Sequence, residues 1–197
     1  HAGWLTGAYP QLGDPNRVKQ DLAELEHQEL ILQESAEPDL TYAFRQAITQ
    51  SVTYESLPFA MKALLHEQIG AYLETAFAAS PEQGLDLLAF HYDRSGNTEK
   101  RRDYLRRAGE AAQAVYSNLA AIDYYTRALP LQSAQDRPGL LMRFGQVLEL
   151  IGEWSSAAER YTQALTEAEP RQAKAGSVGG AVAGDGAGQV RGRQGLL

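Results

Sequence analysis

The sequence of 197 residues contains no cysteine, and this absence excludes several kinds of chemistry at once. Without a thiol the chain has no disulfide, no thiolate metal ligand and no cysteine nucleophile, which fits a reducing compartment such as the cytoplasm. It also has no Gly-x-x-x-x-Gly-Lys-Ser/Thr phosphate loop and no Gly-x-Ser-x-Gly nucleophile elbow. We therefore expect a non-catalytic protein that carries no cofactor and no metal.

Basic residues are scarce as well. The 18 lysines and arginines are outnumbered by 25 aspartates and glutamates, which gives a formal net charge of −7. Nucleic-acid binding needs a positive surface, so this balance argues against it. No apolar run reaches the roughly 18 residues of a membrane-spanning helix, and no signal peptide is evident. The chain begins with His1 rather than methionine, so we expect it to be a piece of a longer protein.

Two short motifs have some, but not all, of the ligands of a metal site. His66-Glu67 opens like the helix of a zinc protease, yet Gly70 stands where the second zinc-binding histidine would be. Asp93 begins a run like a calcium loop, yet the twelfth position, which needs a bidentate carboxylate, is Tyr104. We interpret His66 as a packing residue inside a helix, and the segment after Asp93 as a turn followed by a helix cap.

Apolar periodicity and breaking residues predict a mostly α-helical chain. The expected elements are helices at 17–33, 45–57, 59–79, 81–94, 99–116, 119–129, 140–151 and 155–167, and a short strand at 40–44. Ser80 and Gln83 fit a capping box with Pro81 at the first helical position, and Thr98 is predicted to cap the next helix. The Pro-Gly pair at 138–139 is expected in a loop.

The second half of the chain repeats itself at a spacing of 36 residues. Six positions recur, five of them with the same residue: Gly109, Ala112, Ala121, Tyr125, Ala128 and Leu129 return as Gly145, Leu148, Ala157, Tyr161, Ala164 and Leu165. The pattern resembles the tetratricopeptide repeat (TPR), a helix-turn-helix unit of 34 residues that buries its apolar face by stacking. Small residues at Gly145 and Ala157 would let two helices approach closely, with Trp154 and Tyr161 filling the space beside them. A weaker third unit is predicted at about 82–109, so that helix 99–116 serves two neighbouring pairs.

A second resemblance covers roughly residues 17–170. The segments that carry it are Tyr42–Pro58, Leu65–Glu67, Tyr72–Glu74, Leu87–Tyr92, Tyr104–Gly109 and Tyr124–Leu129. Their order is similar to the region after the ATPase core in large bacterial signalling proteins. Those proteins join a class III adenylate/guanylate cyclase domain, an AAA-like (STAND-type) ATPase and tetratricopeptide repeats. The chain departs from that family at Gln46, Thr53 and Phe90.

This second resemblance implies a small winged-helix-like connector at 1–79, followed by a short TPR-like α-α superhelix at 80–170. The catalytic parts of such proteins would lie upstream and be absent here. Residues 173–197 are dominated by Gly, Ala and Val and carry no helical stripe, so we expect a disordered tail, bounded at 171–197. Because a stacked array normally continues or ends in a capping helix, two interpretations stay open: a frameshifted or artificial end, and a genuine flexible tail.

Repeat geometry gives the candidate binding site, because the first helix of each unit lines the groove of a stacked array. The groove residues predicted in this way are Arg106, Arg107, Glu110, Gln113, Met142, Arg143, Gln146 and Glu149. Arginines in a groove can hold the carboxylates or phosphates of a partner by paired hydrogen bonds. The alternative for the basic cluster at 100–107 is a solvated helix face offset by neighbouring acids.

The function predicted from these observations is a non-catalytic regulatory and protein-interaction region of a bacterial cytoplasmic signal-transduction ATPase or cyclase. It would bind a protein or peptide partner, or the ATPase core of its own parent, through the TPR groove. Two alternatives stay open: a fragment of a DNA-binding transcriptional regulator that uses the winged-helix-like segment, and a free-standing TPR adaptor. The acidic balance of residues 1–79 argues against DNA contact.

Overall fold

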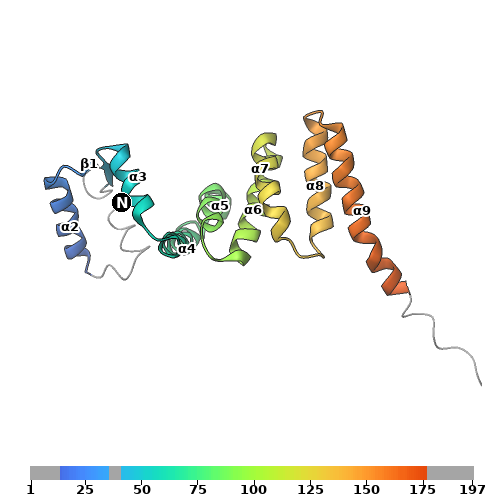
Figure 1. The fold of residues 1–197 in the computed structure, drawn as a ribbon, viewed down its shortest axis with the longest axis horizontal. Coiled ribbons are helices and arrows are strands. Elements are labelled where there is room, and N and C mark those ends of the chain that lie inside the picture. Colours follow the sequence, from blue (N-terminus) through green and yellow to red (C-terminus); the bar gives the residue numbers. More distant parts are fainter. Residues whose placement is uncertain (1–13, 36–40, 177–197) are drawn as a thin grey trace, which may run out of the picture.

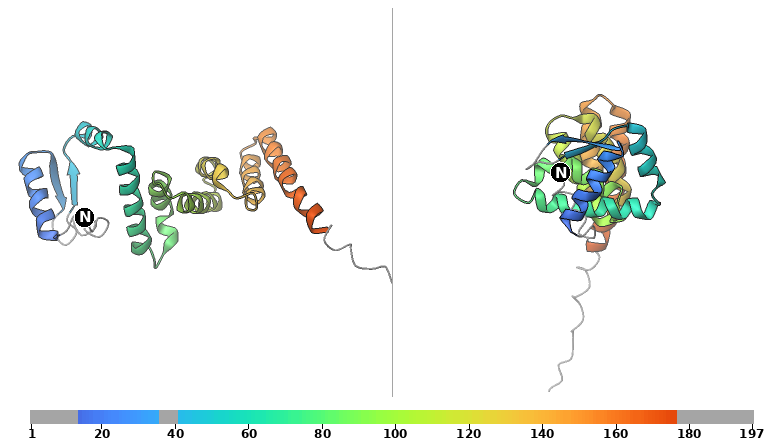
Figure 2. Two further views of the ribbon diagram at one scale, coloured as in Figure 1. Left: turned by 60° about the horizontal axis from the view of Figure 1, so that its bottom comes forward. Right: turned by 90° about the vertical axis from the view of Figure 1, so that its left-hand side faces the viewer.

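The computed structural model of the chain describes residues 14–35 and 41–176, whose elements follow one another along the long axis of the molecule (Figure 1). Seen along that axis, in the right-hand view of Figure 2, they overlap in one narrow bundle. In these residues the fold is mostly helical, as predicted, with a small hairpin near the N-terminus. The elements are α2 (Pro15–His27), β1 (Ile31–Ser35), β2 (Thr41–Phe44), α3 (Ala47–Ser56), α4 (Phe59–Ala76), the 3-10 helix η2 (Pro81–Gly84), α5 (Leu85–Asp93), α6 (Thr98–Ala114), α7 (Asn118–Ala128), the 3-10 helix η3 (Leu129–Leu131), α8 (Arg137–Leu150) and α9 (Trp154–Gly176).

The N-terminal part is built around an antiparallel hairpin in which Ile31 of β1 lies opposite Phe44 of β2. Helix α2 ends at His27 because Glu29 adopts the left-handed backbone conformation, with φ of 59°, and turns the chain into β1. The prediction of one helix over 17–33 is therefore wrong beyond His27. Ile31 continues the apolar stripe of that helix in sequence, but its side chain is buried as part of the hairpin.

The strand predicted at 40–44 and the two helices predicted after it are confirmed as β2, α3 and α4. Leu57 is extended and precedes Pro58, and a residue before proline avoids the helical region, so α3 and α4 are separate helices. These short elements are compatible with the winged-helix-like connector that the resemblance implies for 1–79, of which 1–13 and 36–40 lie outside the described residues.

The repeat is held together by tyrosine rings that lie directly on helical glycines. A Cβ atom on Gly109 would lie 2.5 Å from the ring of Tyr125, and one on Gly145 would lie 2.4 Å from the ring of Tyr161. Real Cβ atoms do not approach other atoms so closely, so glycine is what lets α7 pack on α6 and α9 on α8. The predicted close approach at Gly145 is confirmed, and Ala157 on the facing helix is buried.

The same contact occurs a third time, where Gly70 of α4 would place a Cβ atom 2.8 Å from the ring of Tyr92 on α5. This contact indicates that α4 and α5 form the third, degenerate unit, whereas the prediction placed that unit at about 82–109. Helix α6 packs against both α5 and α7, as predicted, and the stacked rings of Tyr92 and Tyr104 join it to α5 with their centroids 5.1 Å apart.

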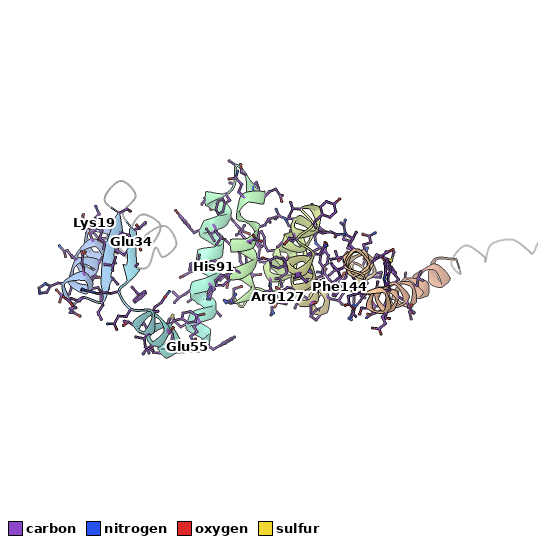
Figure 3. The ribbon with its side chains drawn as sticks, turned by 90° about the horizontal axis from the view of Figure 1, so that it is seen from above. Lys19, Glu34, Glu55, His91, Arg127 and Phe144 are labelled. Carbon is purple, nitrogen blue, oxygen red and sulfur yellow. The ribbon has the colours of Figure 1, made fainter. Side chains whose placement is uncertain are left out.

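The array has one continuous apolar core. Its buried members come from every helix from α4 to α9: Leu73, Leu85, Leu88, Ala89, Tyr92, Tyr104, Leu105, Ala108, Ala121, Tyr125, Ala128, Leu140, Phe144, Val147, Leu148 and Ala157. Figure 3 labels one of them, Phe144 on α8. Because each helix buries one face against its neighbours in the stack, the core continues from one unit to the next.

Two helix starts differ from the predictions. Ser80 makes no capping hydrogen bond with its side chain, and its backbone carbonyl instead accepts from the Gln83 N–H in a 3-10 turn. Helix α6 is capped by Asn97, whose Oδ1 accepts from the Lys100 N–H at 3.1 Å, and not by Thr98. An asparagine oxygen one residue earlier reaches the third free amide of the helix, which leaves Thr98 inside the first turn.

Helices α8 and α9 are longer than predicted. Residues 138–139 belong to the first turn of α8 rather than to a loop, because proline has the right φ for that position. Helix α9 continues past the predicted end at Glu167 to Gly176, so the first six residues of the predicted tail at 171–197 are helical, and the others lie outside the described residues. Trp154, expected to fill space beside this pair, is instead 65% exposed at the start of α9.

Candidate partner-binding groove

Helices α6 and α8 are the first helices of the two clear units, and two clefts open between them. A polar cleft of about 530 Å³ is lined by Arg102, Asp103, Arg106, Glu110, Gln132, Gln135, Asp136, Gly139, Leu140 and Arg143. An aromatic cleft of about 850 Å³ is lined by Gln113, Ala114, Tyr116, Gln146, Glu149, Leu150, Ile151, Gly152 and Trp154. The two clefts together are called the groove below.

The cations of the polar cleft are largely paired with acids from the same surface. Arg106 donates to Asp103 at 2.8 Å and to both oxygens of Glu110 at 3.0 Å, and Arg143 lies 3.5 Å from Glu110. Burial would lower the pKa of Arg106, but these hydrogen bonds raise it, so the guanidinium stays charged. Among the described residues Arg102 has no ion pair. Arg102 and the exposed Arg143 are therefore the cations that this cleft offers to a partner.

Six of the eight predicted groove residues line a cleft. Arg106, Glu110 and Arg143 line the polar cleft, and Gln113, Gln146 and Glu149 line the aromatic cleft. Arg107 lines neither, because one step along a helix turns a side chain by about 100°. Its guanidinium lies 5.2 Å from the ring centroid of Tyr104 and 3.6 Å from Asp103. Met142 is exposed on α8 but also lies outside both clefts.

The rest of the basic cluster on α6 connects helices. Lys100 donates to Glu74 of α4 at 2.7 Å, and Arg101 donates to Asp93 of α5 at 2.9 Å. Arg127 of α7, labelled in Figure 3, donates to the other oxygen of Asp93 at 2.8 Å. The Asp93 side chain is only 14% exposed, so it is a shared anion inside the array. Lys100 and Arg101 therefore connect α6 to the preceding helices and line neither cleft.

The apolar wall of the aromatic cleft was not predicted. Tyr116, Leu150, Ile151 and Trp154 are all exposed there, Tyr116 to 76%. Tyr116 occupies the turn position that Gly152 holds one repeat later, and both have a left-handed backbone, with φ of 58° and 84°. A tyrosine in this conformation is strained. The replacement of a turn glycine by tyrosine is the one signal in the sequence that could have indicated this wall.

The polar groups of the aromatic cleft are held by tyrosines from the second helices of the two units. The Tyr125 hydroxyl donates to Gln113 at 2.6 Å, and the Tyr161 hydroxyl donates to Glu149 at 2.8 Å. Burial and the hydrogen bond to Glu149 raise the pKa of Tyr161, so its hydroxyl remains a proton donor. Glu149 is the only charged residue among those described that line this cleft.

A second polar cluster lies outside the groove, where α3, α4 and α5 meet. His66 Nε2 lies 3.0 Å from the Tyr54 hydroxyl, and His66 Nδ1 lies 3.0 Å from His91 Nδ1, so one histidine donates to the other. Burial and the nearby Arg94 lower the pKa of His66, and burial, His66 and Arg94 lower the pKa of His91 to about 4. The expected packing role of His66 is confirmed, and its partner His91, labelled in Figure 3, lies 25 residues further along the chain.

Two basic residues of the N-terminal segment are paired with acids. Arg45 lies 3.2 Å from Glu29, and Lys62 lies 2.6 Å from Glu55, which lowers the positive charge that a DNA backbone would meet. Within residues 14–35 and 41–176, no three histidines, aspartates or glutamates come together as they would around a metal ion.

None of the helices in the described part of the chain is both long and apolar enough to cross a bilayer. Comparison of the chain with models of known protein families, with curated proteins and with solved structures found no match in any of the three. The likeness to signalling ATPases therefore remains a resemblance carried by the short segments named above, and the site is defined by the geometry of the groove alone.

Proposed function

We propose that this chain is a non-catalytic interaction region that binds a segment of a protein partner in the groove between α6 and α8. The observation that carries the proposal is the pairing of two clefts along the same two helices, one polar and one apolar. A stacked array offers such a surface to an extended or helical peptide without changing its own core.

The resemblance to the region after the ATPase core of bacterial signalling proteins supplies the setting. In that setting the chain is cytoplasmic, and the partner is either another protein or the ATPase core of the parent. Binding would bias the parent between resting and active states, provided that the bound segment has different affinities for them. Deleting residues 82–170 from the parent should then change its nucleotide turnover, and unchanged turnover would contradict this part of the proposal.

The binding function itself is tested by selecting peptides from a displayed random library with the complete chain. Selected peptides are then titrated against two variants with the same substitution, Gln146→Trp in the groove and Gln83→Trp on η2. Both glutamines are exposed, and only Gln146 lines a cleft. We expect Gln146→Trp to weaken binding at least tenfold and Gln83→Trp to leave it unchanged. Failure to select any peptide, or equal binding by both variants, would overturn the proposal.

A further inference from the structure

We propose that the aromatic cleft receives a lysine or arginine side chain of the partner, so that the part of the bound segment that enters this cleft is cationic. This inference rests on the proposed function and specifies its partner. It starts from the difference between the two clefts. In the polar cleft acids and arginines face one another, whereas in the aromatic cleft the carboxylate of Glu149 has no cation beside it among the described residues.

The carboxylate of Glu149 is held in position without being neutralised. Its hydrogen-bond donor is the hydroxyl of Tyr161, at 2.8 Å, which carries no charge. Glu153, next to the lining residues Gly152 and Trp154, adds a second exposed carboxylate that has no ion pair in the described part of the chain. This end of the groove is therefore negative, and an incoming cation would meet an oriented acceptor rather than a mobile side chain.

The apolar wall fits the remainder of a basic side chain. Lysine and arginine place their methylene stems along apolar surface while the charged head stays in a polar environment. Leu150 and Ile151 can cover such a stem, and the exposed rings of Tyr116 and Trp154 can face the cation. An acidic partner would be repelled by Glu149, and a purely apolar one would bury this carboxylate without compensation.

The left-handed backbone of Tyr116 is consistent with this assignment. The equivalent turn position in the next unit is Gly152, which adopts this conformation without strain. Tyr116 is 76% exposed, so the strain is not offset by burial in the core of this chain. A ring that contacts a bound side chain would offset the strain in the complex.

The test uses the complete chain labelled with nitrogen-15 and short synthetic peptides that differ only in carrying lysine, norleucine or glutamate at the same positions. We expect the lysine peptide to shift the Trp154 indole N–H signal and to bind about tenfold more tightly than the norleucine peptide. The glutamate peptide should bind most weakly. Equal affinities, or tightest binding of the glutamate peptide, would overturn the inference.

Variants separate this inference from the proposed function. Glu149→Gln keeps an acceptor for Tyr161 and should reduce the preference for lysine about fivefold, whereas Glu159→Gln, on α9 outside both clefts, should not. If library-selected peptides bind the groove but are neutral or acidic, the inference fails and the proposed function stands. If no peptide binds in the groove, both fail.

Tyr116→Gly tests the role of Tyr116 through two measurements, the urea midpoint and the affinity for the lysine peptide, which should change in opposite directions. We expect it to raise the urea midpoint by removing the strain, and to weaken the lysine peptide by removing part of the wall. A lower midpoint, or unchanged peptide affinity, would contradict the role assigned to Tyr116.

Discussion

Replacing Gly109 with alanine places a methyl group 2.5 Å from the ring of Tyr125. That ring is fully buried and its hydroxyl donates to Gln113, so it cannot move aside without losing core packing. Overpacking of this kind costs about 1–3 kcal/mol, and the upper end applies to an enclosed ring. Alanine recovers about 1 kcal/mol over glycine as a helix former. We therefore expect Gly109→Ala to destabilise the chain by about 2 kcal/mol and to lower Tm by about 4–8 °C.

The assay is urea unfolding of the complete chain followed by far-UV circular dichroism, with unchanged slopes required for comparison. Gly139→Ala is the matched control, because Gly139 is an exposed helical glycine with no atom near its Cβ position. It should stabilise the chain by about 0.5 kcal/mol. Gly145→Ala should fall between the two, because Tyr161 is only partly buried and its ring can shift. A Gly109→Ala protein as stable as Gly139→Ala would refute the tyrosine-on-glycine contact.

Three further predictions concern the contacts between units. Lowering the pH from about 6.5 towards about 4 should reduce the stability of the chain. The pKa values of His66 and His91 in the folded chain lie below the unfolded value of 6.5, so the unfolded chain binds more protons in this range. The urea midpoint should therefore fall less steeply with pH in His91→Gln than in the unmodified chain. Asp93→Asn removes the anion shared by two guanidinium groups and should cost about 2 kcal/mol in the same unfolding assay. Asn97→Ala removes the cap of α6 and should cost about 1 kcal/mol, whereas Thr98→Ala should change stability by less than about 0.5 kcal/mol.

Exposed residues supply the remaining controls. A His91→Gln protein whose urea midpoint falls with pH as steeply as that of the unmodified chain would contradict the first of these predictions. Arg45→Gln breaks an exposed ion pair with Glu29 and should change stability by no more than about 0.5 kcal/mol. If Arg45→Gln cost as much stability as Asp93→Asn, the burial of Asp93 would not explain the cost of Asp93→Asn. Equal losses for Asn97→Ala and Thr98→Ala would contradict the assigned cap.

The repeat could be predicted because its determinants are close in sequence. Gly109 and Tyr125 lie 16 residues apart, recur one unit later, and identify both the helix pair and its contact. The hairpin was partly missed because Ile31 fits the apolar stripe of the preceding helix as well as it fits a strand. The third unit was misplaced because its tyrosine lies 22 residues after Gly70, through the extra turn η2, rather than 16.

The candidate site was predicted in outline, and its chemistry was not. Helix periodicity places Glu110, Gln113, Gln146 and Glu149 in the groove. It cannot show that Lys100 and Arg101 are paired away from the groove, because their partners Glu74 and Asp93 come from other helices. Nor can it show that exposed residues from two turns, which lie in different units, form one apolar wall.

Helix α6 has a further consequence for how the protein unfolds. It is joined to α5 through the Tyr92–Tyr104 stack and to α7 through the Gly109–Tyr125 contact. On either side, α4 contacts α5 through Gly70 and Tyr92, and α8 contacts α9 through Gly145 and Tyr161. An opening between α5 and α6 therefore leaves two internally packed blocks rather than a random coil. Amide hydrogen exchange should accordingly proceed in steps, with the α4–α5 block and the α6–α9 block each exchanging as a cooperative unit.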